Sequence, residues 1–155
     1  MNKSNSKAVV LTATIAALYT VFVYVLYPLS YGPLQLRMAN ILYPVILYNP
    51  LFSLGFGLGV FMANLGSPFG ALDFIIMPFV TIFACYLAWL LRSKPIIALV
   101  TQALIISIGV AFFPLYLGAG IDMLITFPGI LISQLIIIIP AWYLIWKPLG
   151  YFFND

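Results

Sequence analysis

The sequence predicts an all-α integral membrane protein, a bundle of six transmembrane helices with both termini in the cytoplasm. Composition is the first reason: 65% of the 155 residues are hydrophobic and 6% are charged, whereas a soluble domain carries about 25% charged residues. Such a chain cannot cover its surface with polar groups, so lipid must be part of its solvent. We expect a single transmembrane domain over residues 1–155, located in the cell membrane.

The apolar runs supply the predicted spans. Four of them are long enough to cross a bilayer, which takes about 20 residues per helix: 8–27, 72–91, 95–117 and 123–146. The run 38–65 is interrupted by Asn49-Pro50, and a proline moves the residue before it out of helical geometry. We therefore expect two short helices there, of about 11 and 15 residues, enclosed by the bundle because neither crosses about 30 Å alone.

The positive charges give the orientation. With six spans, five cations share one side, the cytoplasmic side by the positive-inside rule: Lys3, Lys7, Arg92, Lys94 and Lys147. With one long helix over 38–65, the last three would instead face outside. Six spans is therefore the prediction, and the loops near residues 31–37, 64–73 and 118–122 then lie outside. We expect Arg37 at the outer side, at the end of the first of these loops.

Several function classes are disfavoured by the residues that the chain lacks. It contains no histidine, and its three acids do not pair by spacing, so we expect no enzyme. Cys85 is the single cysteine, which argues against a disulfide or a zinc site. We expect no cofactor. The net charge of +3 sits at segment ends and reports orientation, not nucleic-acid binding. No Walker-type loop is present, so any ATP dependence must come from a partner.

Arg37 marks the candidate site, because it is the one cation far from a predicted cytoplasmic end and charges are costly in a membrane. Its guanidinium is a planar fork of donors that suits a carbonyl or carboxylate. Nearby amides, acids and tyrosines could complete a site for a small planar ligand, with the aromatic rings as stacking surfaces. The alternative is a structural ion pair between Arg37 and Asp73. The candidate ligand contacts are Tyr31, Gln35, Arg37, Asn40, Asn64, Asp73 and Gln102.

Two stripes of small residues indicate close helix contacts. Ala13 and Ala17 are four residues apart, a spacing that lets two membrane helices approach closely. They could form a docking face for another membrane protein, or they could pack inside the bundle. Gly55, Gly59 and Ala63 repeat the same spacing, and for these we expect close packing within the chain.

The polar segments resemble those of one known family. The segment Ser30-Tyr-Gly-Pro-Leu-Gln-Leu-Arg37, followed by Tyr48-Asn49, Ala63-Asn64, Ser67, Phe69-Gly70 and Asp73, is similar to the QueT family. Its members are S components, the substrate-binding subunits of energy-coupling-factor (ECF) vitamin transporters. The family is associated with uptake of deazaguanine precursors of queuosine. The resemblance is strongest over residues 8–85.

The resemblance implies a small six-helix membrane protein that captures a deazaguanine-like base outside and delivers it inward. It also implies a transmembrane coupling subunit and two ATPase subunits as partners. Ala13 and Ala17 resemble the Ala-x-x-x-Ala stripe by which S components dock on the coupling subunit. In one place the chain departs from the family: a Ser-Glu pair follows the arginine there, and Ala39 and Asn40 occupy those positions here.

Other functions stay open at this point. The chain could be an S component for another small planar, vitamin-like ligand. It could also be a small oligomeric membrane channel or structural protein that uses the two stripes as its interface. A membrane enzyme or accessory factor is disfavoured by the missing catalytic groups. Ligand binding by the purified monomer would separate the first possibility from the others.

Overall fold

The computed structural model describes residues 3–31 and 35–153, and within these ranges the regular secondary structure is helical, with no strand. Residues 32–34 of the predicted first loop, and the first two and last two residues of the chain, lie outside the described residues. Four described helices are long and apolar enough to cross a membrane: Ser6–Val25, Ala71–Leu90, Pro95–Gly118 and Met123–Trp146. They correspond to the four long predicted runs, and the chain is a multi-pass membrane protein.

The first helix differs from its predicted bounds. We expected it over 8–27, but α1 spans Lys3–Val25, and a short helix α2 follows over Tyr27–Ser30. Between them Leu26 leaves helical geometry, with φ −109° and ψ 36°. Pro28 explains the break, because a proline cannot donate to the preceding helical turn but is well suited to the first turn of a new helix.

The run 38–65 is divided as predicted, into η1 (Met38–Leu47) and α3 (Phe52–Asn64). Asn49 stabilises the turn between them, because its side-chain oxygen accepts from the backbone N–H of Leu51 at 2.9 Å. The prediction of an α-helix for the first piece is wrong: η1 is a 3₁₀-helix with Pro44 inside it. This less regular backbone is tolerated because η1 is mostly buried and contacts α1, α3, α4 and α6.

The remaining helices complete the bundle. α4 spans Ala71–Leu90, and α5 spans Pro95–Val110 and continues as the wider π-helix η2, Ala111–Gly118. α6 spans Met123–Ala141 and continues as the π-helix η3, Trp142–Trp146, before the short η4, Pro148–Phe152. Proline lies inside η2 and just before η3 (Pro114 and Pro140). Since proline removes a helical hydrogen bond, these are places where wider turns are expected.

Glycines bring α1 and α3 together, as the second stripe predicts. A methyl group added at Gly55 would lie 2.6 Å from the carbonyl oxygen of Thr12. One added at Gly59 would lie 3.1 Å from the carbonyl oxygen of Ala16. Only hydrogen at these positions allows the two backbones to pack this closely. Ala63, the third member of the stripe, is fully buried.

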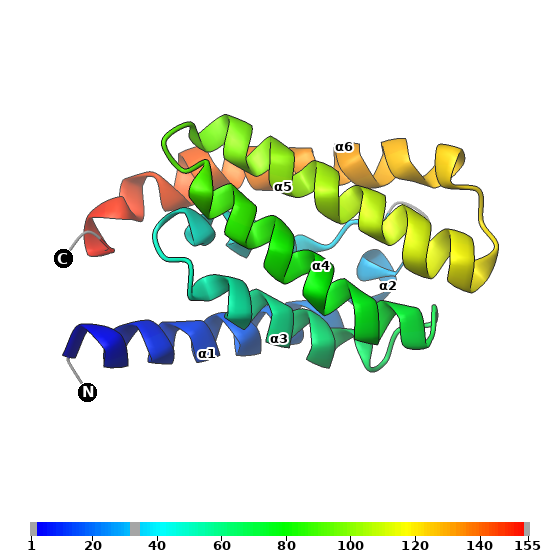
Figure 1. Cartoon of the computed structure of the whole chain (residues 1–155), viewed down its shortest axis with the longest axis horizontal. Helices are drawn as coiled ribbons and strands as arrows, with labels where there is room; N and C mark the ends of the chain where they lie inside the picture. Colours follow the sequence, from blue (N-terminus) through cyan, green and yellow to red (C-terminus); the bar gives the residue numbers. More distant parts are fainter. Residues whose placement is uncertain (1–2, 32–34, 154–155) are drawn as a thin grey trace.

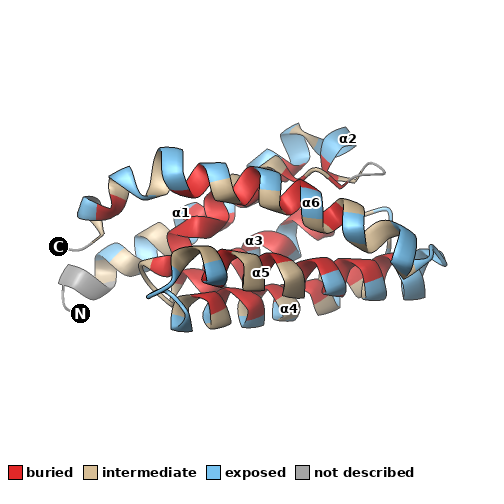
Figure 2. Ribbon diagram, turned by 90° about the horizontal axis from the view of Figure 1, so that it is seen from above, coloured by how far each residue is buried: buried red, intermediate tan, exposed pale blue. Residues whose placement is uncertain are grey.

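The two ends of the bundle have different contents. Both termini lie at one end, together with the loop that joins α4 to α5 (Figure 1). The loops that join α3 to α4 and η2 to α6 lie at the opposite end (Figure 1). Exposed residues follow the outer faces of the helices and buried ones face the centre (Figure 2). Many exposed side chains are large and apolar, such as Phe79, Leu124 and Leu144, as expected of a surface that faces lipid.

Candidate ligand-binding site

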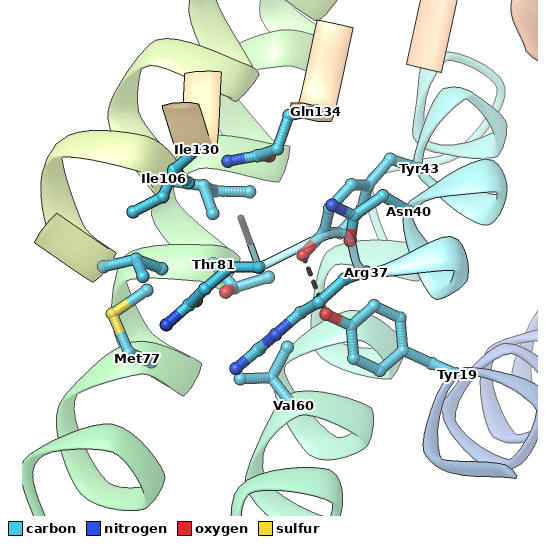
Figure 3. A pocket seen from close by; sticks show the side chains of 12 residues that line it. Tyr19, Arg37, Asn40, Tyr43, Val60, Met77, Thr81, Ile106, Ile130 and Gln134 are labelled. Carbon is cyan, nitrogen blue, oxygen red and sulfur yellow. Dashed lines mark hydrogen bonds between the residues drawn. The ribbon is translucent and has the colours of Figure 1, made fainter. Parts of the chain in front are cut away.

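A narrow pocket lies inside the bundle, between η1 and the long helices (Figure 3). Its cavity volume is only about 10 Å³, which is room for about one water molecule. Its polar lining comes from Tyr19, Gln35, Arg37, Asn40, Tyr43, Thr81 and Gln134, and the rest is apolar. Polar groups that converge on a buried, partly apolar pocket are a feature of small-molecule sites. The pocket also involves helices that the sequence analysis did not connect with the site, since Ile106 and Val110 of α5 and Ile130 and Gln134 of α6 line it.

Arg37 reaches this pocket from the start of η1, where its backbone is extended. It lies at the end of the segment that precedes η1, as the sequence analysis expected, and it is 7% exposed, so the bundle encloses it. Its place on the outer side of the membrane stays a prediction. Its Nη2 lies 3.7 Å from Oδ2 of Asp73, and its Cζ lies 5.0 Å from the centre of the Tyr31 ring. Both contacts stabilise the buried charge. Its Nε and Nη2 nevertheless have no hydrogen-bond partner among the described residues.

Asp73, which pairs with Arg37, is itself positioned by hydrogen bonds from its neighbours. Asp73, in the first turn of α4, accepts from Nδ2 of Asn64 at 2.9 Å and from the hydroxyl of Ser67. Asn64 also accepts from the hydroxyl of Tyr31 at 2.9 Å. Burial raises the pKa of Tyr31, so this phenol stays protonated and remains a donor. Neither Asn64 nor Asp73 is among the described residues that line the pocket. Both instead belong to a hydrogen-bonded network beside Arg37.

Gln35 and Asn40, two of the candidate ligand contacts, both line the pocket. Gln35 is 4% exposed, and its Nε2 has no partner within the described ranges. Its φ of 46° is unusual for a residue other than glycine, and such strain gathers at functional sites. Asn40 is also buried, with its Oδ1 unpaired in the described part of the chain. Gln35 also lines a second, open groove, with Tyr31 and Phe69 among its walls, so the groove and the pocket are neighbours.

Sequence analysis did not identify Gln134 or Tyr19, and it considered Tyr43 only as one of several tyrosines whose rings could stack on a ligand. The two tyrosine hydroxyls are 3.3 Å apart, the contact drawn dashed in Figure 3. Gln134 is the one amide in the apolar run 123–146, and a buried amide in a membrane span is a signal that could have identified it. Gln102, which was a candidate, donates instead to the sulfur of Cys85 at 3.1 Å and is not among the described lining residues.

Asp122, Ala13 and Ala17 lie outside the pocket, on the surface of the bundle. Asp122 is exposed and caps α6, where it accepts from the backbone N–H of Leu124 at 2.8 Å. Ala13 and Ala17 are exposed on α1, along an open apolar groove that Leu58 of α3 completes. The bundle therefore does not enclose this pair.

These features define a class: a helical, multi-pass membrane protein with polar side chains gathered around a narrow pocket inside the bundle. Residues 9–147 match the sequence model of a family described as QueT transporter. The chain therefore belongs to the QueT transporter family, and it is a transport protein. No curated protein matches the chain, and no solved structure matches it. The family match covers nearly the whole sequence and confirms the resemblance noted above.

Proposed function

We propose that this chain is the substrate-binding S component of an ECF uptake transporter, and that it captures a deazaguanine precursor of queuosine from outside. Its membership of a membrane transporter family supports this role. The observation that carries the proposal is a set of four open groups around one pocket: the Arg37 guanidinium, Gln35 Nε2, Asn40 Oδ1 and Gln134 Oε1. Each is buried and has at least one polar atom without a hydrogen-bond partner among the described residues.

The unpaired groups include both hydrogen-bond donors and acceptors, and this combination favours a planar heterocycle as the ligand. Arg37 and Gln35 offer donors, whereas Asn40 and Gln134 offer acceptors. A deazaguanine presents a ring carbonyl that accepts and, beside it, a ring N–H and an amino group that donate. Such a ring would satisfy groups that are otherwise costly to bury unpaired. Because the pocket is narrow, we expect the Arg37 and Gln35 side chains to move as the ligand enters.

Asn40 bears on the charge of the ligand. It stands where the family pattern has a glutamate, so the pocket has one fewer negative charge. An amide cannot neutralise an ammonium group, and an unpaired buried cation is expensive. Asp73 is the rival source of that charge, but it already faces Arg37 and accepts from Asn64 and Ser67. We therefore propose that a neutral deazaguanine is preferred over an aminomethyl one, and comparing Asn40→Glu with Asp73→Asn separates the two residues.

The proposed topology has six spans and both termini in the cytoplasm. The loop that joins α4 to α5 lies at the same end as both termini (Figure 1). This loop carries Arg92 and Lys94, and the positive-inside rule therefore assigns that end to the cytoplasm. The groove that leads past Gln35 would then open to the outside, which is where an uptake system meets its substrate.

The proposed partners are a transmembrane coupling subunit and two ATPases. Ala13 and Ala17 are the proposed docking face, because they are exposed and small enough for a partner helix to approach closely. The groove between α1 and α3 beside them is almost entirely apolar, as suits a contact made within the membrane.

An uptake assay tests this proposal. Cells without deazaguanine uptake of their own would express the chain alone, the coupling module alone, or both together. We expect radiolabelled 7-cyano-7-deazaguanine to accumulate only with both, and only while ATP is available. Accumulation with the chain alone would contradict the ECF role. No accumulation in any cell, despite correct assembly, would contradict the substrate.

A further inference from the structure

Gln134, on the α6 side of the pocket, has one end of its side-chain amide bonded and the other end unpaired among the described residues. It is 2% exposed, and its Nε2 donates to the hydroxyl oxygen of Ser107 on α5 at 2.8 Å. Its Oε1 is buried and has no partner among the residues that the structure describes. In Figure 3 Gln134 enters the pocket across from Arg37 and Tyr19. One end of the amide is therefore anchored, and the other end is available to a ligand.

The chemistry of the missing partner follows from that anchor. With Nε2 engaged by Ser107, the group left over is a carbonyl oxygen, which can only accept a hydrogen bond. A buried acceptor without a partner is unfavourable, and neighbouring apolar side chains such as Ile106 and Ile130 cannot satisfy it. A ligand group that completes the site must therefore be a donor, such as a ring N–H, an amino group or a hydroxyl, and not a carbonyl or an ether.

The order of groups along the pocket indicates which donor it is. Arg37, the residue just before η1, and Asn40, in the first turn of η1, both line the pocket. A guanine-like edge presents a carbonyl, then a ring N–H, then an amino group. If the carbonyl meets Arg37 and the ring N–H meets Asn40, the amino group points toward the next acceptor, which is Gln134.

We infer that Gln134, oriented by Ser107, is the residue that selects ligands carrying an exocyclic amino group; this rests on the proposed function of the pocket as a deazaguanine site. Ser107 is a positioning residue, because it acts through the amide. Recognition of the 2-amino group of a deazaguanine is thereby assigned to one residue of α6. The same ring without the amino group would leave Gln134 buried and unpaired, and sites built to bond such a group discriminate strongly against analogues that lack it.

The chain offers a matched control. Gln102 is also a fully buried amide, with Nε2 bonded to Cys85 and Oε1 without a partner in the described part of the chain. It differs from Gln134 in that it is not among the described pocket-lining residues. Replacing either glutamine by methionine removes an amide of the same size from a membrane helix. Only the Gln134 substitution should change ligand choice.

The test is calorimetric binding of 7-deazaguanine and of 7-deazahypoxanthine, which lacks the amino group, to the purified full chain. We expect the wild type to prefer 7-deazaguanine by about tenfold or more. Gln134→Met should reduce that ratio to about threefold or less, and Gln102→Met should leave it unchanged. Ser107→Ala should lower the ratio partly, because the amide can then rotate. The ratio of the two affinities is informative because a general loss of protein stability weakens the binding of both ligands alike.

Each other result decides against the inference. A wild type that binds both ligands equally, or a folded Gln134→Met that keeps the full preference, would overturn it while leaving a deazapurine site in place. If Gln134→Met does not fold, Ser107→Ala carries the test, and an unchanged ratio there would overturn it. Failure of the wild type to bind either deazapurine would overturn both the inference and the proposed ligand.

Discussion

Replacing Arg37 by alanine should weaken ligand binding by about 2–3 kcal/mol, which is about 30- to 150-fold in Kd. The magnitude follows from the position of the guanidinium. It is 7% exposed, and Nε and Nη2 have no hydrogen-bond partner among the described residues. A bond from such a donor to a ligand is charge-assisted and dry, which places it at the upper end of the usual range. Nη2 faces Oδ2 of Asp73, but at 3.7 Å the two atoms are too far apart for a hydrogen bond, so the ion pair leaves this donor open to a ligand.

Two further variants separate binding from folding. Arg37→Lys keeps a cation near Asp73 but replaces the planar fork by a point charge, so it should restore binding only partly. Arg37→Ala leaves the Asp73 carboxylate buried without its cation, which lowers stability. The double variant Arg37→Ala/Asp73→Asn removes both charges and should recover stability but not affinity. Arg92→Ala is the matched control, because Arg92 is exposed in the α4–α5 loop.

The assay is isothermal titration with the neutral ligand 7-cyano-7-deazaguanine, on protein shown by thermal unfolding to be folded. Affinity within twofold of the wild type in folded Arg37→Ala would refute the argument that Arg37 contacts the ligand. It would leave Arg37 as half of a structural ion pair with Asp73, the alternative that the sequence left open.

Three other predictions concern topology, docking and ligand charge. A cysteine at Pro68 should react with an impermeant maleimide applied outside, and one at Ser93 only after permeabilisation; external labelling at Ser93 would rule out the proposed orientation. Ala17→Trp should bind ligand normally but abolish uptake, because Ala17 is exposed on the proposed docking face. Its control Ala16→Trp should misfold, because Ala16 is 6% exposed and packs against α3. Normal uptake by Ala17→Trp would show that this face is not the docking surface. Asn40→Glu should shift preference toward 7-aminomethyl-7-deazaguanine by about tenfold, or about 1.4 kcal/mol, in competitive titration, and an unchanged preference would show that another residue sets ligand charge.

Much of the fold could be predicted because membrane proteins leave strong one-dimensional signals. Uninterrupted apolar length identified the four long helices, and Asn49-Pro50 identified the break between η1 and α3. The 3₁₀ geometry of η1 could not be predicted, since a short apolar run has the same pattern in either kind of helix. What allows that geometry is enclosure by neighbouring helices, which is a property of the tertiary structure.

The site was predicted in part for a related reason. Arg37, Gln35 and Asn40 were identified because polar residues clustered in an apolar chain stand out locally. Whether Asn64 and Asp73 would face a ligand or one another depends on which partners fold against them, and the sequence carries no such information. Gln134 comes from a helix far away in the chain, and only packing of α6 against η1 brings it to the pocket.

The most direct test of the central claim, that this pocket binds a deazaguanine, is a thermal-shift screen of the purified wild-type chain. The ligands would be 7-deazaguanines, common purines, thiamine, riboflavin and biotin. A ligand that binds only the folded state stabilises it by about 2.7 kcal/mol at 100 times its Kd. We expect such stabilisation from 7-cyano-7-deazaguanine, and its loss in Arg37→Ala. Stabilisation by one of the vitamins and by no deazaguanine would contradict the account.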